Sequence, residues 1–127
     1  MKKRLKRIAY TFKHKIAFLQ TQKKLCGKNN LRGYLHDLDK LLMYVFYWHL
    51  PLKKISERHR LNNAHHVRSG LKKTREDLIE TVIDWECARL TKPDKQLNAY
   101  ETLQKFYPAY SNVYLPIIKE LLPEQII

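Results

Sequence analysis

The chain has few of the features that mark a secreted, disulfide-linked or membrane-spanning protein. Its two cysteines, Cys26 and Cys87, lie far apart and form no CxxC pair, so we expect reduced thiols in a cytoplasmic protein. The longest apolar run covers about half of a membrane span, which predicts no transmembrane helix. Lysines interrupt the apolar residues after the basic N-terminus, so no signal peptide is expected.

The sequence also lacks the short motifs of several enzyme classes. It has no glycine-rich phosphate loop, no GxSxG elbow and no HExxH motif, which argues against P-loop, serine-hydrolase and zinc-protease chemistry. Neither cysteine has the surroundings of a recognisable nucleophile. Internal repeats, low-complexity segments and convincing strand patterns are missing too. The 127 residues therefore predict an all-α fold, a single compact helical bundle of five or six helices spanning 1–127.

Acidic residues are scarce in the first part of the chain, although the whole sequence has a formal net charge of +13. Residues 1–75 contain 20 Lys+Arg and 3 Asp+Glu, a net charge of +17, whereas residues 76–127 have a net charge of −4. A basic half favours a polyanionic partner: a nucleotide or other phosphorylated small molecule, a nucleic acid, or an acidic surface. The alternative is a lysine-rich face that only keeps the protein in solution.

Residues 2–25 predict one helix with two apolar faces. The first face has three- and four-residue spacing and consists of Leu5, Ile8, Ala9, Phe12, Ile16 and Leu19. The second falls on roughly the opposite side and consists of Tyr10, His14, Ala17, Phe18, Thr21 and Leu25. A helix that is apolar on two faces is expected to lie between neighbours, with His14 pointing into the protein. Gly27 is a suitable C-terminal stop.

A second helix is predicted from about Leu31 to His49, ended by Pro51. It contains His36, Asp37 and Lys40, followed by an almost wholly apolar run. Because this helix is apolar nearly all round, we expect it to be central. A carboxylate buried there needs a metal, a cation or several hydrogen bonds.

The remaining segments are expected to be shorter. Residues 52–71 are predicted to be irregular, because residues 56–66 contain three histidines and two asparagines, and Gly70 marks another break. A third strong helix begins near Thr74 with a capping box to Asp77, and it places Asp84 among apolar residues. After a loop at 91–95, two short helices at 100–107 and 111–122 close the core, and Pro116 either kinks or opens the second.

Histidines and carboxylates thus enter apolar surroundings from several segments. They are His14, His36, Asp37, His59, His65, His66 and Asp84. Imidazole and carboxylate ligands without thiolates suit a divalent metal (Mn, Fe, Zn, Ni or Mg), as one ion or two. Structural alternatives exist for each: His14 as a satisfied core histidine, the later histidines in a solvated loop, and Asp84 in a salt bridge to a lysine.

The order of these residues resembles that of the HD-domain superfamily of metal-dependent phosphohydrolases, with His14, His36-Asp37 and Asp84 as the matching positions. The sequence is more closely similar to a small uncharacterised bacterial and phage family. That family's pattern is a helical histidine, HDxxK, NxHH and an acidic residue before Asp-Trp, here ending at Asp84-Trp85. The similarity spans about residues 8–90. The GYP signature of the two-metal HD-GYP group is absent.

The resemblance implies roles for individual residues. A first ion would be held by His14, His36, Asp37 and Asp84, and Asp37 would bridge to a second ion on His65, His66 or both. Lys40 would contact a phosphate; the alternative is a plain surface lysine. Asp37 and Lys40 are therefore the predicted catalytic residues.

Further residues are secondary candidates. His59 is the weaker ligand candidate because Arg58 and Arg60 flank it. Glu80 would orient a histidine ligand. Asn62 and Asn63 would orient ligands or make turns. An anion-binding rim could be extended by Arg68, Lys72 and Lys73, with plain solvated side chains as the alternative.

Three functions are compatible with this pattern. The first is a metal-dependent phosphohydrolase that acts on a nucleotide or other phosphate ester. The second is a basic nucleic-acid-binding module on an HD-like scaffold without catalysis, whose binding would weaken steeply with salt. A third is an inhibitor that binds an acidic host protein, which only size and charge suggest.

Overall fold

The computed structural model describes residues 2–63, 65–67, 69, 72–91 and 97–126, and these residues form helices and no strand. The order is α1 (Lys2–Cys26), α2 (Leu31–Leu35), α3 (Leu38–Phe46), α4 (Leu52–Asn62), α5 (Arg75–Thr91), α6 (Ala99–Phe106), η1 (Pro108–Tyr110), α7 (Ser111–Leu121) and η2 (Pro123–Gln125). Within that part of the chain, six α-helices have eight residues or more and α2 is short. The all-α prediction is confirmed.

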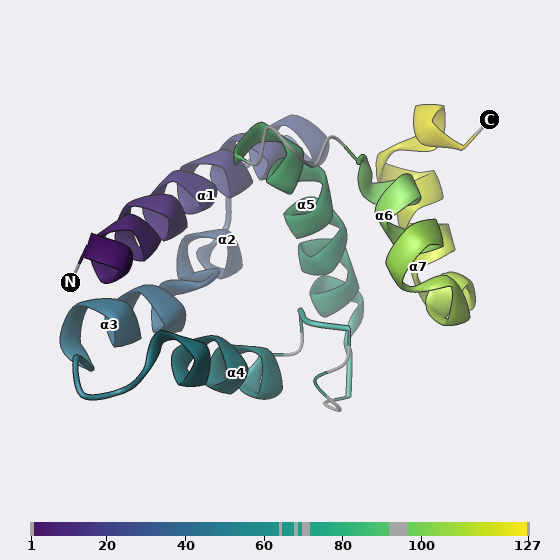
Figure 1. The fold of residues 1–127 in the computed structure, drawn as a ribbon. Helices are drawn as coiled ribbons and strands as arrows, with labels where there is room; N and C mark the ends of the chain where they lie inside the picture. The colour runs from purple at the N-terminus through teal and green to yellow at the C-terminus, as the bar shows by residue number, and fades with distance from the viewer. Residues whose placement is uncertain (1, 64, 68, 70–71, 92–96, 127) are drawn as a thin grey trace.

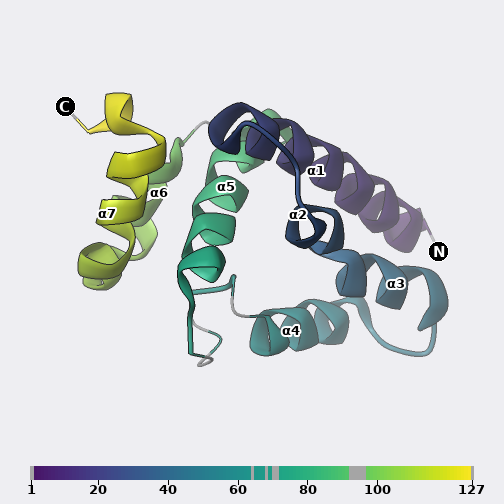
Figure 2. The same ribbon diagram turned by 180° about the vertical axis from the view of Figure 1, so that it is seen from behind.

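Helix α5 is the element on which the others are arranged. Helices α1, α3, α4 and α5 follow one another around a frame with α2 beside α1, and α6 and α7 lie on the other side of α5 (Figures 1 and 2). Two clusters of buried side chains meet on α5. Val82 packs with Leu103, Tyr114 and Ile118 from α6 and α7, whereas Ile83 and Cys87 pack with Ala17 and Phe18 of α1.

Helix α1 buries only one of its two apolar faces. The buried side chains include His14, Ala17, Phe18 and Thr21, as predicted for the second face. The first face is exposed, and Leu5, Phe12 and Ile16 are 53%, 54% and 45% exposed. The expectation that α1 lies between neighbours on both faces is therefore wrong. Among the described elements, α2, α3 and α5 make the main contacts with α1, while Leu5, Phe12 and Ile16 stay exposed.

The predicted helix over 31–49 is two helices, with a break at His36 and Asp37. Asp37 adopts a left-handed backbone conformation with φ 58°, which costs a non-glycine residue roughly 1–2 kcal/mol. In a continuous helix, neighbouring side chains point in different directions, whereas the break allows both His36 and Asp37 to face one cluster. Helix α3 is also peripheral rather than central, since Phe46 is 69% exposed and Trp48 48% exposed.

The segment after Pro51 is more regular than expected. Residues 52–62 form α4, which begins directly after Pro51 and buries Ile55 and His59, four residues apart, on one side. Helix α5 begins with the predicted capping box: the Thr74 backbone N–H donates to the Asp77 carboxylate, and the Thr74 hydroxyl accepts from the Asp77 N–H. Pro116 lies inside α7. Gly70, Arg68 and the loop positions 92–95 lie outside the described residues.

A close contact between α1 and α2 gives a test of this packing. A Cβ on Gly33 would lie 2.0 Å from Oε1 of the buried Gln22, whose amide donates to the N-cap Asn30 at 2.9 Å. Gly33→Ala is expected to lower the free energy of unfolding by about 1 kcal/mol in urea titrations, because the lost hydrogen bonding outweighs the better helix propensity of alanine. In a Gln22→Ala background the same change should be neutral or stabilising, and equal losses in both backgrounds would contradict this contact.

Candidate metal centre

Histidine and carboxylate side chains from five parts of the chain lie close together. Helix α1 contributes His14, the α2–α3 break contributes His36 and Asp37, and α4 contributes His59. The segment after α4 adds His65 and His66, and α5 adds Glu80 and Asp84. Within the described part of the chain these residues form overlapping groups in which one ligand atom of each member lies within 4.8 Å of the others.

The first group joins His14, His36, Asp37 and Asp84. The Oδ1 atom of Asp84 lies 2.6 Å from His14 Nε2 and 3.2 Å from His36 Nε2. Asp37 Oδ2 lies 3.5 Å from the same His36 nitrogen and 3.9 Å from His14 Nε2. Two imidazole nitrogens and two carboxylates thus converge on one point, which is a donor set that suits a divalent transition metal.

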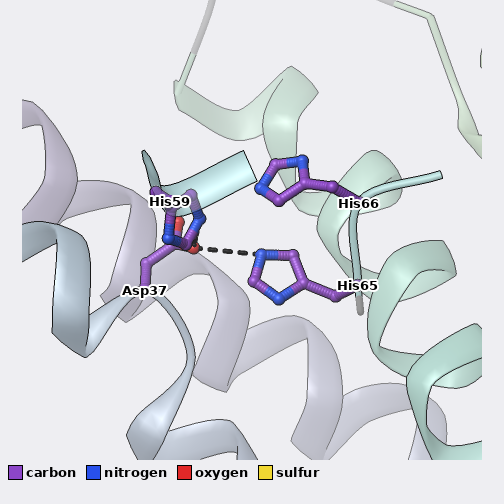
Figure 3. Close-up of side chains that lie close together, drawn as sticks. All are labelled: Asp37, His59, His65 and His66. Carbon is purple, nitrogen blue, oxygen red and sulfur yellow. Dashed lines mark ion pairs between the residues drawn. The ribbon is translucent and has the colours of Figure 1, made fainter. Parts of the chain in front are cut away.

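The second group joins Asp37, His59, His65 and His66 (Figure 3). Asp37 Oδ1 lies 2.8 Å from His59 Nε2 and 3.2 Å from His65 Nε2. Despite this ion-pair proximity, four buried atoms of the group make no hydrogen bond: Asp37 Oδ1 and the Nε2 atoms of the three histidines. Asp37 therefore faces the first group with one carboxylate oxygen and the second with the other.

Such orphaned atoms are rare inside proteins, because an unpaired buried polar group costs roughly 1–3 kcal/mol. A single cation could satisfy the lone pairs of all four, because they face one another. Imidazole nitrogens together with a carboxylate oxygen form a donor set that a divalent metal could bind. Cys87 lies 3.9 Å from His14, but burial raises the pKa of its thiol well above the usual value, so it remains a poor ligand.

Two further carboxylates, those of Glu80 and Asp39, lie next to the Nδ1 atoms of the histidines, the ring nitrogens that face away from the two ligand groups. Glu80 Oε2 lies 2.8 Å from His36 Nδ1 and 2.7 Å from His65 Nδ1. Asp39 lies 3.0 Å from His59 Nδ1, and the Asn63 amide donates to Asp39 at 3.0 Å. Carboxylates in this position fix the tautomer and orientation of a ligating histidine. Glu80 thus occupies the orienting position that the sequence predicted.

The charges of the cluster are strongly coupled. Burial disfavours the charged form of His36, but Asp84 and Asp37 outweigh it and raise its pKa to about 10. Burial disfavours the charged form of His65 as well, yet the adjacent carboxylates of Asp37 and Glu80 outweigh it and raise its pKa to about 9. Burial would raise the pKa of Glu80, but its bonds to these two histidines lower it to about 2. Without an ion, the carboxylates are therefore balanced by protons on His36 and His65.

His66 differs from its neighbours, because burial and the adjacent charge of His65 lower its pKa to about 3. Below the ordinary histidine pKa of 6.5, His66 is protonated in the unfolded chain but stays neutral in the folded chain. The free energy of unfolding therefore falls as the pH decreases. The raised pKa values of His36 and His65 have the opposite effect on stability from the lowered pKa of His66. Their stabilisation is complete below pH 6.5 and is lost as the pH rises towards 9 and 10.

The metal-free protein is therefore expected to be most stable near pH 6.5. Its thermal midpoint, followed by circular dichroism in the presence of a chelator, should fall on both sides of that value. In His66→Gln the acidic decline between pH 6.5 and 4.5 should flatten, since Glu80 and its fellow carboxyls begin to lose their contribution only below their ordinary value of 4.5. A midpoint that rises steadily from pH 6.5 to 9 would contradict the charge pattern.

A cavity of about 290 Å³ is lined by members of both groups and by residues of α5 and α6. Its polar lining includes Asp37, Asp84, His66 and the half-buried Lys40. Other lining residues are apolar and aromatic: Trp85, Ala88, Leu97, Phe106 and Tyr107. Trp85 and Tyr107 stack with ring centroids 5.4 Å apart. The cavity thus combines charged and polar side chains with apolar and aromatic ones.

The structure places the predicted site residues unequally. All six predicted metal ligands lie in the two groups, and Lys40 lines the cavity beside them. His59, ranked lower on the sequence because arginines flank it, is 1% exposed and lies in the second group. Neighbours along a helix point in other directions, so Arg58 and Arg60 are exposed while His59 turns inwards. Its four-residue spacing from Ile55 was the usable signal.

Two of the three residues suggested for an anion-binding rim, Lys72 and Lys73, lie among the described residues. Lys73 donates to the His66 carbonyl at 2.7 Å and to the Ser69 hydroxyl at 3.2 Å, so it holds the histidine segment in place. Lys72 is exposed, and Arg68 lies outside the described residues. Asn62 donates to the Arg58 carbonyl within its own helix, a local role rather than a ligand-orienting one.

Comparison with known proteins gave no match for this chain among family models, curated proteins or solved structures. Among the described residues, no helix has the length and apolar character needed to cross a membrane. Any functional conclusion therefore depends on the geometry and chemistry of the residues themselves.

Proposed function

We propose that the protein is a metal-dependent phosphohydrolase that acts on a nucleotide or another phosphate ester, on an HD-like site. The observation that carries the proposal is the convergence of buried imidazole and carboxylate groups on two adjoining points that share Asp37, with four unpaired atoms at the second point. The first ion would be held by His14, His36, Asp37 and Asp84. The second would be held by Asp37, His59, His65 and His66.

The residues fit the metals expected from the sequence. Imidazole-rich sets with carboxylates and no thiolate suit Mn, Fe, Zn and Ni, while Mg prefers oxygen ligands and fits less well. Bound there, a pair of ions supplies an activated water and neutralises charge that develops on a phosphoryl group. The protein's own part is to orient the ligands through Glu80 and Asp39 and to present a partly enclosed cavity.

The cavity supports a phosphate ester as the substrate class. Lys40 lines the same cavity as Asp37 and Asp84, and an ammonium group there would pair with a phosphate oxygen. The aromatic rings of Trp85 and Tyr107 in the lining suit a leaving group that contains a flat ring, such as a nucleoside or a phenol. The basic half of the chain would attract such anions from solution.

A metal and activity screen tests the proposal. Protein purified without a metal-affinity tag should contain Mn, Fe, Zn or Ni by elemental analysis, or take up Mn²⁺ when it is supplied. The loaded protein should hydrolyse at least one member of a panel of mononucleotides and aryl phosphates, and a chelator should abolish the activity. Failure to bind any of these metals would refute the metal centre. Metal binding with no hydrolysis across the panel would refute the phosphohydrolase proposal alone.

Lys40→Met is expected to lower kcat/KM for a phosphate ester by about tenfold to a hundredfold. The change keeps the apolar stem but removes a charge-assisted hydrogen bond to phosphate, worth about 1.5–3 kcal/mol. Metal content should be unchanged, because Lys40 belongs to neither ligand group. Lys54→Met, an exposed lysine on α4, is the matched control. Equal kinetics in the two variants would show that Lys40 does not touch the substrate.

A further inference from the structure

The exposed face of α1 forms a continuous apolar ridge. Leu5, Phe12 and Ile16 follow one another at helical spacing and are 53%, 54% and 45% exposed. Ile8 and Leu19 lie along the same line and are half-buried. We call these five residues the outer ridge. Contiguous apolar surface of this kind on a protein marks an interaction site, because leaving it in water is unfavourable.

A row of lysines runs along one side of the outer ridge. Its members are Lys2, Lys6, Lys13 and Lys24, all of them exposed. At 3.6 residues per turn, this lysine row lies roughly 100° further round the helix than the ridge. Residues 1–36 contain no acidic residue, so no carboxylate on α1 or α2 neutralises it.

An aromatic side chain marks the N-terminal end of the ridge. The guanidinium of Arg4 donates to the Tyr44 and Leu50 carbonyls at 3.0 and 2.7 Å and lies 4.9 Å from the centroid of the Trp48 ring. Trp48 is thereby held beside the first turn of α1, although it is 48% exposed. The indole therefore lies beside the first turn of α1, the turn in which the ridge begins.

A second helix borders the other side of the ridge. Lys15 donates to the Tyr34 and His36 carbonyls, which places α2 next to α1 at this level. Tyr34 and Leu35 of α2 are 52% and 51% exposed. The ridge therefore has amphipathic and aliphatic side chains on one flank and lysines on the other.

We propose that the outer ridge docks this protein on the surface of an anionic phospholipid bilayer. An interfacial helix inserts leucine, isoleucine and phenylalanine into the boundary of the acyl chains while flanking lysines reach the headgroup phosphates. Tryptophan and tyrosine are enriched at the level of the lipid headgroups, and Trp48 and Tyr34 would lie at that level. The helix would lie on the bilayer and would not cross it.

Other occupants fit the same surface less well. A second copy of the chain would bring two lysine rows together within a half that carries a net charge of +17. Nucleic acid offers phosphates and base faces, for which exposed leucine and isoleucine have no partner. A protein partner would need an acidic groove shaped to a convex helix, whereas a bilayer deforms around one. The apolar ridge and the adjoining charge together favour lipid.

Sedimentation with vesicles tests the proposal on the full chain. We expect the protein to sediment with vesicles of phosphatidylcholine and phosphatidylglycerol and to stay in the supernatant with phosphatidylcholine alone. Phe12→Ser and Ile16→Ser should each weaken binding by about tenfold, since each removes the burial of one large apolar side chain. Lys13→Gln should weaken it by about fivefold. Val113→Ser, which removes a similarly exposed apolar side chain on α7, should change nothing.

Tryptophan fluorescence gives a second readout. In a Trp85→Phe background the remaining Trp48 emission should shift to shorter wavelength on adding the anionic vesicles. Binding to neither vesicle would overturn the proposal. So would binding that depends on the lysines but not on Phe12 or Ile16, because adsorption would then be electrostatic only. A concentration-dependent dimer lost in Phe12→Ser, or nucleic-acid binding lost in that variant, would assign the ridge to those partners instead.

Discussion

Asp37→Asn is expected to leave the protein without bound metal at either ligand group. Asp37 is the one residue shared by the two four-membered groups, and its two oxygens face different sets of histidines. The asparagine amide has a single, uncharged oxygen, so it cannot offer an anionic oxygen to each of the two groups. Elemental analysis should find no stoichiometric metal, and hydrolysis should fall by more than about a hundredfold, since even the outer partners of metal ligands cost up to that much.

Three substitutions at Asp37 separate the loss of metal from the loss of fold. The residue has a left-handed backbone with φ 58°, which glycine adopts freely and asparagine tolerates better than alanine. All three variants should lack metal. In the presence of a chelator, however, Asp37→Gly and Asp37→Asn should be about 1 kcal/mol more stable than Asp37→Ala. Metal retained by any of the three would disprove the shared-ligand arrangement.

Asp39→Asn is the matched control for this series. Asp39 is the other carboxylate near the start of α3, but it contacts the far nitrogen of His59 and belongs to neither four-membered group. Its loss should weaken metal binding at the second group by about tenfold to a hundredfold and leave the first group intact. A complete loss of metal in Asp39→Asn would indicate that the cluster collapses as a unit, and the Asp37 result would then say nothing about bridging.

The sequence predicted the class of fold and the members of the site better than it predicted their surroundings. His14, His36, Asp37 and Asp84 could be singled out because polar residues in apolar helical segments need partners. Helical periodicity also gave the capping box at Thr74 and Asp77. These signals are local: each depends on residues within one or two turns, and local chemistry decides them.

The errors arose where tertiary packing decides the outcome. Periodicity identified two apolar faces on α1 but cannot say which of them has neighbours, so the exposure of Phe12 and Ile16 could not be foreseen. The apolar run after Asp37 predicted a continuous central helix. The helix is instead interrupted at His36 and Asp37, where both side chains face one cluster. The other members of that cluster come from distant parts of the sequence, so the local pattern does not reveal the break.

His14→Gln and His66→Gln are expected to remove different ions. His14 belongs only to the first group and His66 only to the second, while Asp37 belongs to both. Each variant should therefore keep one equivalent of metal where the wild type binds two, and Asp37→Asn should keep none. Elemental analysis counts the ions, and titration calorimetry with Mn²⁺ should show one binding step in place of two.

Electron paramagnetic resonance distinguishes a shared centre from two independent sites. Two Mn²⁺ ions bridged by one carboxylate are magnetically coupled, so the wild type should give a coupled spectrum. His14→Gln and His66→Gln should each give the six-line spectrum of an isolated ion, because one partner of the pair is missing. If hydrolysis needs both ions, as in an in-line displacement clamped from two sides, both variants lose activity despite their remaining metal. Uncoupled spectra in the fully loaded wild type would instead mean that Asp37 serves one ion, and that the orphaned oxygen facing His59 and His65 has another partner.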